Sequence, residues 1–131
     1  MTASRPPGPR NGLFGLANYR QARASYLQLT IQLERQFGDA FDVVETLESG
    51  QFNRVIHDPP MFSLAGHLYS QDFYAELYRV LTDRGRLFHY IGDLKSKSGA
   101  GVARGVRQRL IAAGFRRVED KPRAFGVVAT K

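Results

Sequence analysis

The first apolar pattern in the chain is an alternation within YLQLTIQLER, residues 26–35. Leu27, Leu29, Ile31 and Leu33 occupy every second position, and polar side chains stand between them. A period of two places these apolar residues on one face of a strand, whereas on a helix they would spread around the axis. The pattern therefore predicts a strand over residues 26–35.

Four further strands are predicted from short apolar or β-branched runs that end at turn signals. They lie in residues 52–58, in residues 85–93 and, as a closing hairpin, in residues 115–131. The run GRLFHYIGD has a largely apolar body, which is typical of a strand buried on both faces. The turn around Asp120-Lys121-Pro122 joins the two strands of the hairpin.

Between these strands, three segments combine helical spacing with start or stop signals. Asp39 can cap a short helix in DAFDVVETLESG, which Gly50 ends. Ser70 is the expected N-cap of a helix in SQDFYAELYRVLTDRG, and Gly114 ends an amphipathic helix in GVARGVRQRLIAAGF. The stretch LKSKSGAG before this last helix has the composition of a flexible loop.

The elements follow the order strand, helix, strand, helix, strand, helix, strand, strand. Such alternation predicts an α/β fold with a mostly parallel sheet, helices on its faces and a C-terminal antiparallel hairpin. A length of 131 residues suffices for one domain, which we place at residues 13–131. Residues 1–12, rich in Pro, Gly and Arg, predict a flexible tail.

The composition excludes several classes of protein. Cysteine is absent, which removes disulfides, thiol catalysis and cysteine-based zinc sites together. No apolar run approaches the roughly 20 residues that a transmembrane helix needs, and the N-terminal residues lack the apolar stretch of a signal peptide. We therefore expect a cytoplasmic protein that does not associate with a membrane.

The net charge is +7, and the basic residues concentrate in the second half of the chain. A surface of this kind can attract nucleic acid or another polyanion. The charges are nevertheless dispersed over predicted strands, loops and helices without forming a compact basic block. This dispersal favours a solvated basic face, so nucleic-acid binding is the weaker interpretation.

Residues 57–93, HDPPMFSLAGHLYSQDFYAELYRVLTDRGRLFHYIGD, resemble the C-terminal half of class I S-adenosylmethionine-dependent methyltransferases. The closer resemblance is to archaeal and bacterial methyltransferases with an HDPPR-F-S-L-A-type motif, an ELYRVL helix and a GRLFHY strand. The terminal GVARGVRQRLIAAGF and FGVVATK also fit that pattern. The likeness covers roughly residues 36–131, and Met61 replaces the arginine expected after the prolines.

The resemblance implies a Rossmann-like sheet with the strand order 3-2-1-4-5-7-6, in which the last strand is antiparallel. Residues 26–35, 53–58 and 86–92 would be its strands 3, 4 and 5. The Gly-rich loop after strand 1 and the ribose-binding acid after strand 2 have no counterpart among the residues before position 26. We therefore expect the chain to be a methyltransferase-like domain truncated at its N-terminal side.

The resemblance also implies where the cofactor S-adenosylmethionine binds. Asp39 matches the acidic residue that faces the adenine amino group, and Ala40 and Phe41 would lie near the same adenine pocket. A second interpretation of Asp39 rests on the sequence alone, because an aspartate after a glycine at a helix start is a common N-cap.

Asp58, Pro59 and Pro60 follow a predicted strand and are the candidate catalytic residues. Ligands of open α/β sheets bind at the carboxyl ends of the strands, where a carboxylate and fixed backbone carbonyls can accept hydrogen bonds from an amino group. The resemblance to amino-methylating enzymes with a D/N-P-P motif implies that this turn orients the nitrogen that receives the methyl group. Alternatively, the three residues form a rigid turn with a capping aspartate.

Candidate substrate contacts come from aromatic and histidine side chains near the same strand ends. Phe62 and Tyr69 could stack on a planar substrate, and His89 is a third candidate substrate contact. One of the histidines His57, His67 and His89 could act as a general base. His57 and His89 would lie on adjacent strands, but packed or hydrogen-bonded histidines are more common there than metal ligands, so we predict no metal site.

The predicted function is methyl transfer to an amino-bearing small molecule or nucleobase. Two alternatives remain open. One is a non-catalytic interaction module, which would form a homodimer or bind a partner subunit through an exposed sheet edge. The other is a nucleic-acid-binding module that uses Arg104, Arg107 and Arg109 of the last helix.

Overall fold

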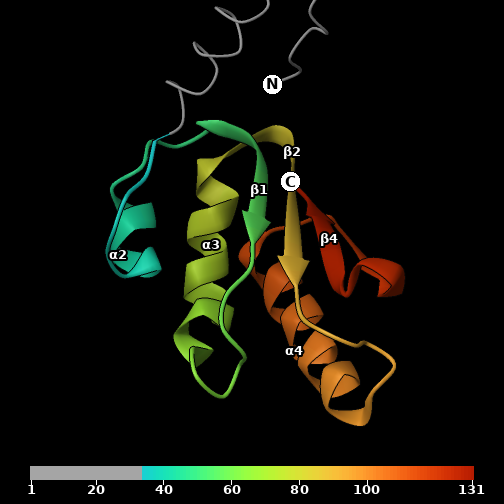
Figure 1. Ribbon diagram of the computed structural model, residues 1–131. Helices are drawn as coiled ribbons and strands as arrows, with labels where there is room; N and C mark the ends of the chain where they lie inside the picture. The colour runs from blue at the N-terminus through green and yellow to red at the C-terminus, as the bar shows by residue number, and fades with distance from the viewer. Residues whose placement is uncertain (1–33) are drawn as a thin grey trace, which may run out of the picture. The chain divides into compact units, whose positions relative to one another are not determined.

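The computed structural model describes residues 34–131 of the chain, and Gly38–Lys131 form one unit with its own core. The predicted tail at residues 1–12 and nearly all of the predicted strand at residues 26–35 lie outside the described residues. Within Gly38–Lys131, helices and strands alternate until the two closing strands (Figure 1). The predicted α/β class is thus confirmed for this unit.

Four strands make one sheet in this unit. They are β1 (Phe52–His57), β2 (Leu81–Tyr90), β3 (Arg117–Lys121) and β4 (Gly126–Thr130), and they lie in the order β1-β2-β4-β3. β1 pairs parallel to β2, while β4 pairs antiparallel to both β2 and β3. This order and these directions match the end of the predicted arrangement, strands 4-5-7-6, with strand 7 reversed.

The prediction of a mostly parallel sheet needs correction at the level of strand pairs. Within the described residues, β1–β2 is the one parallel pair, and the other two pairs are antiparallel. The reason is that β4 inserts between β2 and β3, although β1, β2 and β3 all run in the same direction. The sheet that the structure describes is mixed.

The helices begin and end at slightly different residues from those predicted. They are α2 (Ala40–Glu45), α3 (Gln71–Val80) and α4 (Lys97–Ala113). A short 3-10 helix, η1 (Gly66–Tyr69), precedes α3, and a second, η2 (Pro122–Ala124), lies between β3 and β4. The Oγ atom of Ser70 accepts a hydrogen bond from the amide of Phe73, which confirms the predicted N-cap. Gly114 confirms the predicted stop of α4 with φ of 120°.

Two boundaries were predicted wrongly. The strand β2 begins directly after α3, at Leu81, although residues 81–85 were assigned to the helix. Helix α4 begins at Lys97, inside the stretch predicted to be a loop, because Ser96 caps it by accepting from the amide of Gly99. Residues 98–101 are Ser, Gly, Ala and Gly, a composition typical of a loop, so the first turn of that helix was not predicted.

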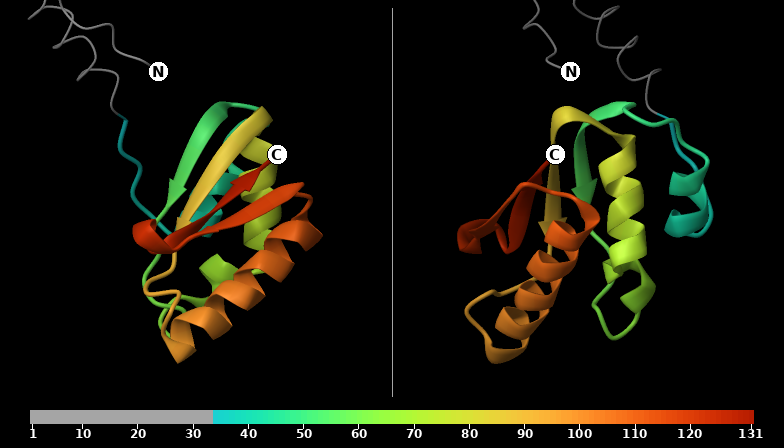
Figure 2. Two further views of the ribbon diagram at one scale, coloured as in Figure 1. Left: turned by 90° about the vertical axis from the view of Figure 1, so that its right-hand side faces the viewer. Right: turned by 180° about the vertical axis from the view of Figure 1, so that it is seen from behind.

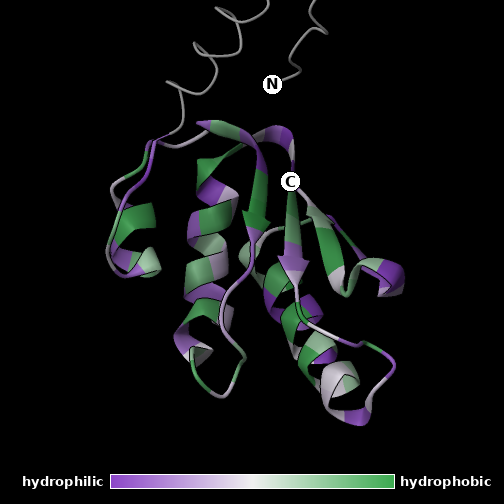
Figure 3. Cartoon of the chain, viewed as in Figure 1, coloured by the Kyte–Doolittle hydropathy of each residue, from purple (hydrophilic) through white to green (hydrophobic). Residues whose placement is uncertain are grey.

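The core lies between the sheet and helices α3 and α4, which pack on one face of it (Figure 2). Hydrophobic residues follow β1, β2 and β4 and the two helices (Figure 3). The fully buried side chains of the strands include Leu87 and Val127, which belong to the same core cluster as Leu77 of α3 and Leu110 of α4. Side chains that point the other way are exposed, as Ile56 is by 78%.

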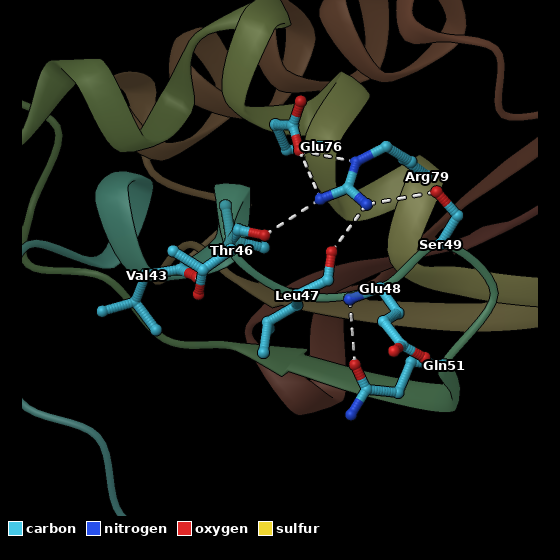
Figure 4. A network of polar contacts seen from close by, with 9 residues as sticks. Val43, Thr46, Leu47, Glu48, Ser49, Gln51, Glu76 and Arg79 are labelled. Atoms are coloured by element: carbon cyan, nitrogen blue, oxygen red, sulfur yellow. Dashed lines mark hydrogen bonds and ion pairs between the residues drawn. The ribbon is translucent and has the colours of Figure 1, made fainter.

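Arg79 of α3 ties the connection between α2 and β1 to the core. Its guanidinium donates hydrogen bonds to the backbone carbonyls of Leu47 (2.7 Å) and Val44 (3.0 Å) and to the hydroxyl of Ser49 (3.2 Å), and it pairs with Glu76 (Figure 4). A planar, multidentate donor is suited to bind several acceptors at once. The side chain of Arg79 therefore holds the connection between α2 and β1 against α3.

Replacing Arg79 by alanine should lower the free energy of unfolding by about 2 kcal/mol, because two backbone carbonyls lose a charged donor. Urea unfolding of this variant measures the effect, and Arg104→Ala, at an exposed position of α4, is the control with little expected change. A loss in Arg79→Ala no larger than in the control would show that the network adds no stability.

No helix within residues 34–131 is long and apolar enough to cross a membrane.

Candidate functional site

Asp58 lies where β1 ends, at the carboxyl edge of the parallel pair β1–β2. It is exposed, and the prolines that follow it lead into a turn-rich segment before η1. The helix after this turn begins beyond Ala65, so Asp58 is not its N-cap. The backbone after Asp58 agrees with the interpretation of a turn at Pro59 and Pro60. Asp58 does not have the capping role that this interpretation gave it.

Tyr69 holds the segment that follows Asp58. Its side chain is 2% exposed, and its hydroxyl donates a hydrogen bond of 2.9 Å to the carbonyl of Pro60. The ring of Phe62 meets the ring of Tyr69 edge-on, with 5.3 Å between the centroids. The hydrogen bond from Tyr69 to Pro60 joins two residues that are nine positions apart in the sequence, and it therefore restrains the turn after β1.

Arg109 of α4 braces the same segment from the other side. Its Nε donates to the carbonyl of Tyr69 at 2.6 Å, and its guanidinium carbon lies 6.0 Å from the ring centroid of Phe62. One arginine thus contacts both aromatic residues that the sequence proposed as substrate contacts. Sequence reasoning placed Arg109 only on a basic surface and missed this role.

His57 and His89 meet side by side at the ends of β1 and β2, with 4.5 Å between their ring centroids. His89 is 0% exposed. Its Nδ1 contacts the carbonyl of Tyr90 at 2.8 Å, and its Nε2 contacts the hydroxyl of Tyr74, also at 2.8 Å. A carbonyl can only accept, so Nδ1 carries the proton and Nε2 accepts from Tyr74.

Burial of the two imidazole rings is the main cause of the lowered pKa values of His57 and His89. It lowers the pKa of His89 to about 3, and it lowers the pKa of His57, whose Nε2 donates to the carbonyl of Leu68. Both imidazoles are therefore neutral near pH 7. His89 has both nitrogens engaged within the core, and it does not line the hollows described below; its predicted role as a substrate contact stays a prediction.

These lowered pKa values predict that the protein loses stability in mild acid. The unfolded chain takes up a proton at His89 below pH 6.5, whereas the folded chain does so only near pH 3. The free energy of unfolding therefore falls as pH drops between these values, and the lowered pKa of His57 adds an effect of the same sign. The slope is about 1.4 kcal/mol per pH unit for each such histidine. Urea unfolding at pH 7, 6 and 5 measures it, and an NMR signal of His89 that titrates near pH 6.5 would contradict the prediction.

A hollow of about 350 Å³ opens beside the turn after β1 and the loop after β2. Both segments start at the carboxyl ends of parallel strands, where ligands of α/β sheets bind. The wall combines apolar, hydroxyl and carboxylate side chains, which include Met61, Phe62, Tyr69, Asp93, Ser96 and Ser98. The predicted contacts Phe62 and Tyr69 thus come together at one hollow, while Asp93 and the serines were missed.

Asp39 caps α2, as one interpretation of the sequence proposed. Its Oδ1 accepts from the amide of Phe41 at 2.8 Å, and its Oδ2 lies 3.3 Å from Nε2 of His67. Ala40 is the exposed first residue of the helix, and the Phe41 ring lies 5.3 Å from that of Phe73. The capping role is observed, and contact of these residues with adenine stays a prediction.

The metal interpretation gains no support from this arrangement. Within residues 34–131, no three histidine or carboxylate groups come close enough to hold a metal ion.

The arginines proposed as a nucleic-acid surface point to different partners. Arg107 pairs with both carboxylate oxygens of Asp120, at 2.8 Å and 3.0 Å, whereas Arg109 binds the carbonyl of Tyr69. Two of the three guanidiniums are therefore engaged with separate parts of the unit. Binding of nucleic acid by Arg104, Arg107 and Arg109 together remains an untested alternative.

Comparison with known proteins decides the family. A model of S-adenosyl-L-methionine-dependent methyltransferases matches residues 15–127. The chain belongs to this methyltransferase family. Family members use S-adenosylmethionine as methyl donor, and the resemblance seen in the sequence is thereby confirmed.

Individual relatives of this methyltransferase chain cover it only in part. An uncharacterised protein of Methanocaldococcus jannaschii is 52% identical over 95 residues, which are 72% of this chain and 33% of that protein. The chain therefore spans about a third of that relative's length. Solved structures of a Thermus thermophilus protein, provisionally described as a DNA modification methylase, are similar to 71% of the chain. One of them has a TM-score of 0.48 and 17% sequence identity, and the match covers 49% of its chain. The form with bound S-adenosyl-L-methionine has a TM-score of 0.46 and 20% sequence identity, and the match covers 52% of its chain.

The described residues fit the family's cofactor only in part. Asp39 offers a carboxylate whose side chain is 47% exposed, with the aromatic Phe41 two positions on. A strand followed by a Gly-rich turn, with a ribose-binding acid after the next strand, is not found within residues 34–131. The described residues therefore account for only part of a cofactor site.

Proposed function

We propose that residues 38–131 form the acceptor side of an S-adenosylmethionine-dependent methyltransferase that modifies an amino group. The observation that carries this proposal is the position of Asp58 and the hollow at adjacent strand ends. Bound S-adenosylmethionine supplies an electrophilic methyl group. The residues of this unit would supply the orientation of the nitrogen that accepts it.

Asp58 is suited to bind an amino group because its carboxylate can accept two N–H bonds. Of the two proline carbonyls, that of Pro60 already accepts from Tyr69. We therefore assign Asp58 and the carbonyl of Pro59 as the acceptors for the amine, with Pro60 as the anchor of the turn. This division refines the sequence prediction, in which both prolines had the same role.

The hollow beside the turn would hold the body of the acceptor. Phe62 is 47% exposed, and its ring can stack on a planar group. A single in-line displacement needs no covalent intermediate with the protein, so positioning of donor and acceptor can supply much of the acceleration. An amino-bearing nucleobase or small aromatic amine suits such a hollow.

A methyl-transfer assay with radiolabelled S-adenosylmethionine tests the proposal. Adenosine and inosine, or cytidine and uridine, differ at one position that carries an amino group in the first and an oxygen in the second. We expect label in products of amino-bearing acceptors and none in their oxygen counterparts. Equal labelling of both members of each pair would contradict amino-group transfer, and so would labelling of the protein itself.

A further inference from the structure

A second hollow of about 340 Å³ adjoins the first, along α4 from Lys97 to Arg109. The two share Phe62, Ser98 and Val102 in their walls. They differ in charge, because Asp93 lines the first, whereas Lys97 and Arg109 line the second and no carboxylate does. A ligand that extends past Phe62 therefore reaches from the first hollow, which Asp93 lines, into the second hollow, which Lys97 and Arg109 line.

The two cations of the second hollow have no carboxylate partner within residues 34–131. The ion pairs among these residues involve Arg79, Arg107, Arg117, Lys121 and His67, and neither Lys97 nor Arg109. Arg109 uses Nε to hold the carbonyl of Tyr69, and its guanidinium also lies beside the hydroxyl of Tyr74. Its two terminal nitrogens carry four N–H donors in all, more than one hydroxyl can accept. A guanidinium so placed can still bind an oxyanion with two donors.

Gly105 explains the position of that guanidinium. A Cβ atom at this residue would lie 2.8 Å from Nη1 and 3.2 Å from Nη2 of Arg109. The side chain of Arg109 thus lies back along α4, over a residue without a side chain, and its charge reaches the hollow. The first turn of α4 carries no acidic residue, and the helix N-terminus adds partial positive charge there.

We propose that this second hollow is an anion subsite, which binds a phosphate or carboxylate group of the acceptor. The subsite itself stands on Lys97, Arg109 and the wall that the hollows share. Its assignment to the acceptor rests on the proposed function. The acceptor is then a planar amine that carries an anionic group, of which a nucleotide is the simplest class.

Inorganic phosphate is the direct probe of the subsite. Titration of the ¹⁵N-labelled full chain, with the ionic strength held constant by sodium chloride, should shift the amides of Lys97, Ser98 and Gly101. Lys97→Ala should weaken this binding at least fivefold. Lys95→Ala is the matched control, since Lys95 is also exposed, lies two residues away and does not line the hollow.

Gly105→Ala is a second variant, which displaces the Arg109 guanidinium without removing a charge. It should weaken phosphate binding while the bond from Arg109 to Tyr69 can persist. Shifts that are absent at 50 mM phosphate, or an equal loss in Lys95→Ala and Lys97→Ala, would overturn the anion subsite, whatever the acceptor is.

The link to the acceptor is tested with matched pairs of probes. Cytidine 5′-monophosphate and adenosine 5′-monophosphate should bind at least tenfold more tightly than cytidine and adenosine, and Lys97→Ala should abolish the difference. A short single-stranded oligonucleotide distinguishes a nucleic-acid source of the phosphate from a free nucleotide. Phosphate binding with no such preference would overturn the assignment to the acceptor, while Asp58-dependent amine transfer would still support the proposed function.

Discussion

Replacing Asp58 by alanine should reduce methyl transfer at least about 100-fold, because the acceptor amine loses the carboxylate that aligns its lone pair with the methyl group. Asp58 is exposed and caps no described helix, so the fold does not depend on it. The expected result is a loss in kcat with little change in the free energy of unfolding. Steady-state kinetics with radiolabelled S-adenosylmethionine, together with urea unfolding, measure both quantities.

Two variants sharpen this experiment. Asp58→Asn keeps an oxygen that can accept from the amine and should lose less activity than Asp58→Ala. Asp83→Ala removes an exposed carboxylate near the start of β2, at the opposite end of the strand, and should transfer methyl groups at the normal rate. An Asp58→Ala variant as active as Asp83→Ala would remove Asp58 from the mechanism.

Replacing Gly99 by alanine should destabilise the loop after β2 and lower the free energy of unfolding by about 1–3 kcal/mol, the usual cost of overpacking. Gly99 lies in the first turn of α4, where a Cβ atom would overlap the backbone carbonyl of Asp93 and lie 2.8 Å from Oγ of Ser96. The carbonyl belongs to the backbone, so the loop itself has to move. Asp93 and Ser96 both line the first hollow, whose shape should change as well.

The chain provides a matched control for this effect two residues along the same helix. A Cβ atom at Gly101 would meet nothing within 4 Å, so Gly101→Ala should be neutral or should stabilise α4 by up to about 1 kcal/mol through helix propensity. Urea unfolding compares the two variants. Equal stability of Gly99→Ala and Gly101→Ala would show that the loop tolerates the displacement.

Local patterns were sufficient to predict most elements of the described unit. Ser70 and Gly114 marked helix ends correctly because capping depends on a few neighbouring residues. The boundary at Leu81 could not be found in this way, since its place in β2 depends on pairing with the distant Phe52. Likewise, the insertion of β4 between β2 and β3 is a tertiary arrangement that only the family resemblance implied.

The candidate site was predictable in part for the same reason. Asp58 and Phe62 could be proposed because a strand end and a pair of prolines mark them in the sequence. Their positions beside the end of β1 agree with the structure, and their roles stay predictions. Arg109 was missed as a brace because its partner, the carbonyl of Tyr69, lies 40 residues away and carries no sequence signal. A weak signal was available: Arg109 directly precedes Leu110, a buried residue of the face that α4 turns to the core.

The most direct test of the central claim is an NMR titration of the ¹⁵N-labelled chain with the amino and oxygen members of each nucleoside pair, in the presence of S-adenosylhomocysteine. We expect adenosine or cytidine to shift the amides of Asp58, Phe62 and Asp93, and inosine and uridine to shift them far less. In the Asp58→Ala variant this difference should disappear. Shifts that are equal for both members, or confined to the opposite end of the sheet near Arg84, would contradict an amine-acceptor site at the ends of β1 and β2.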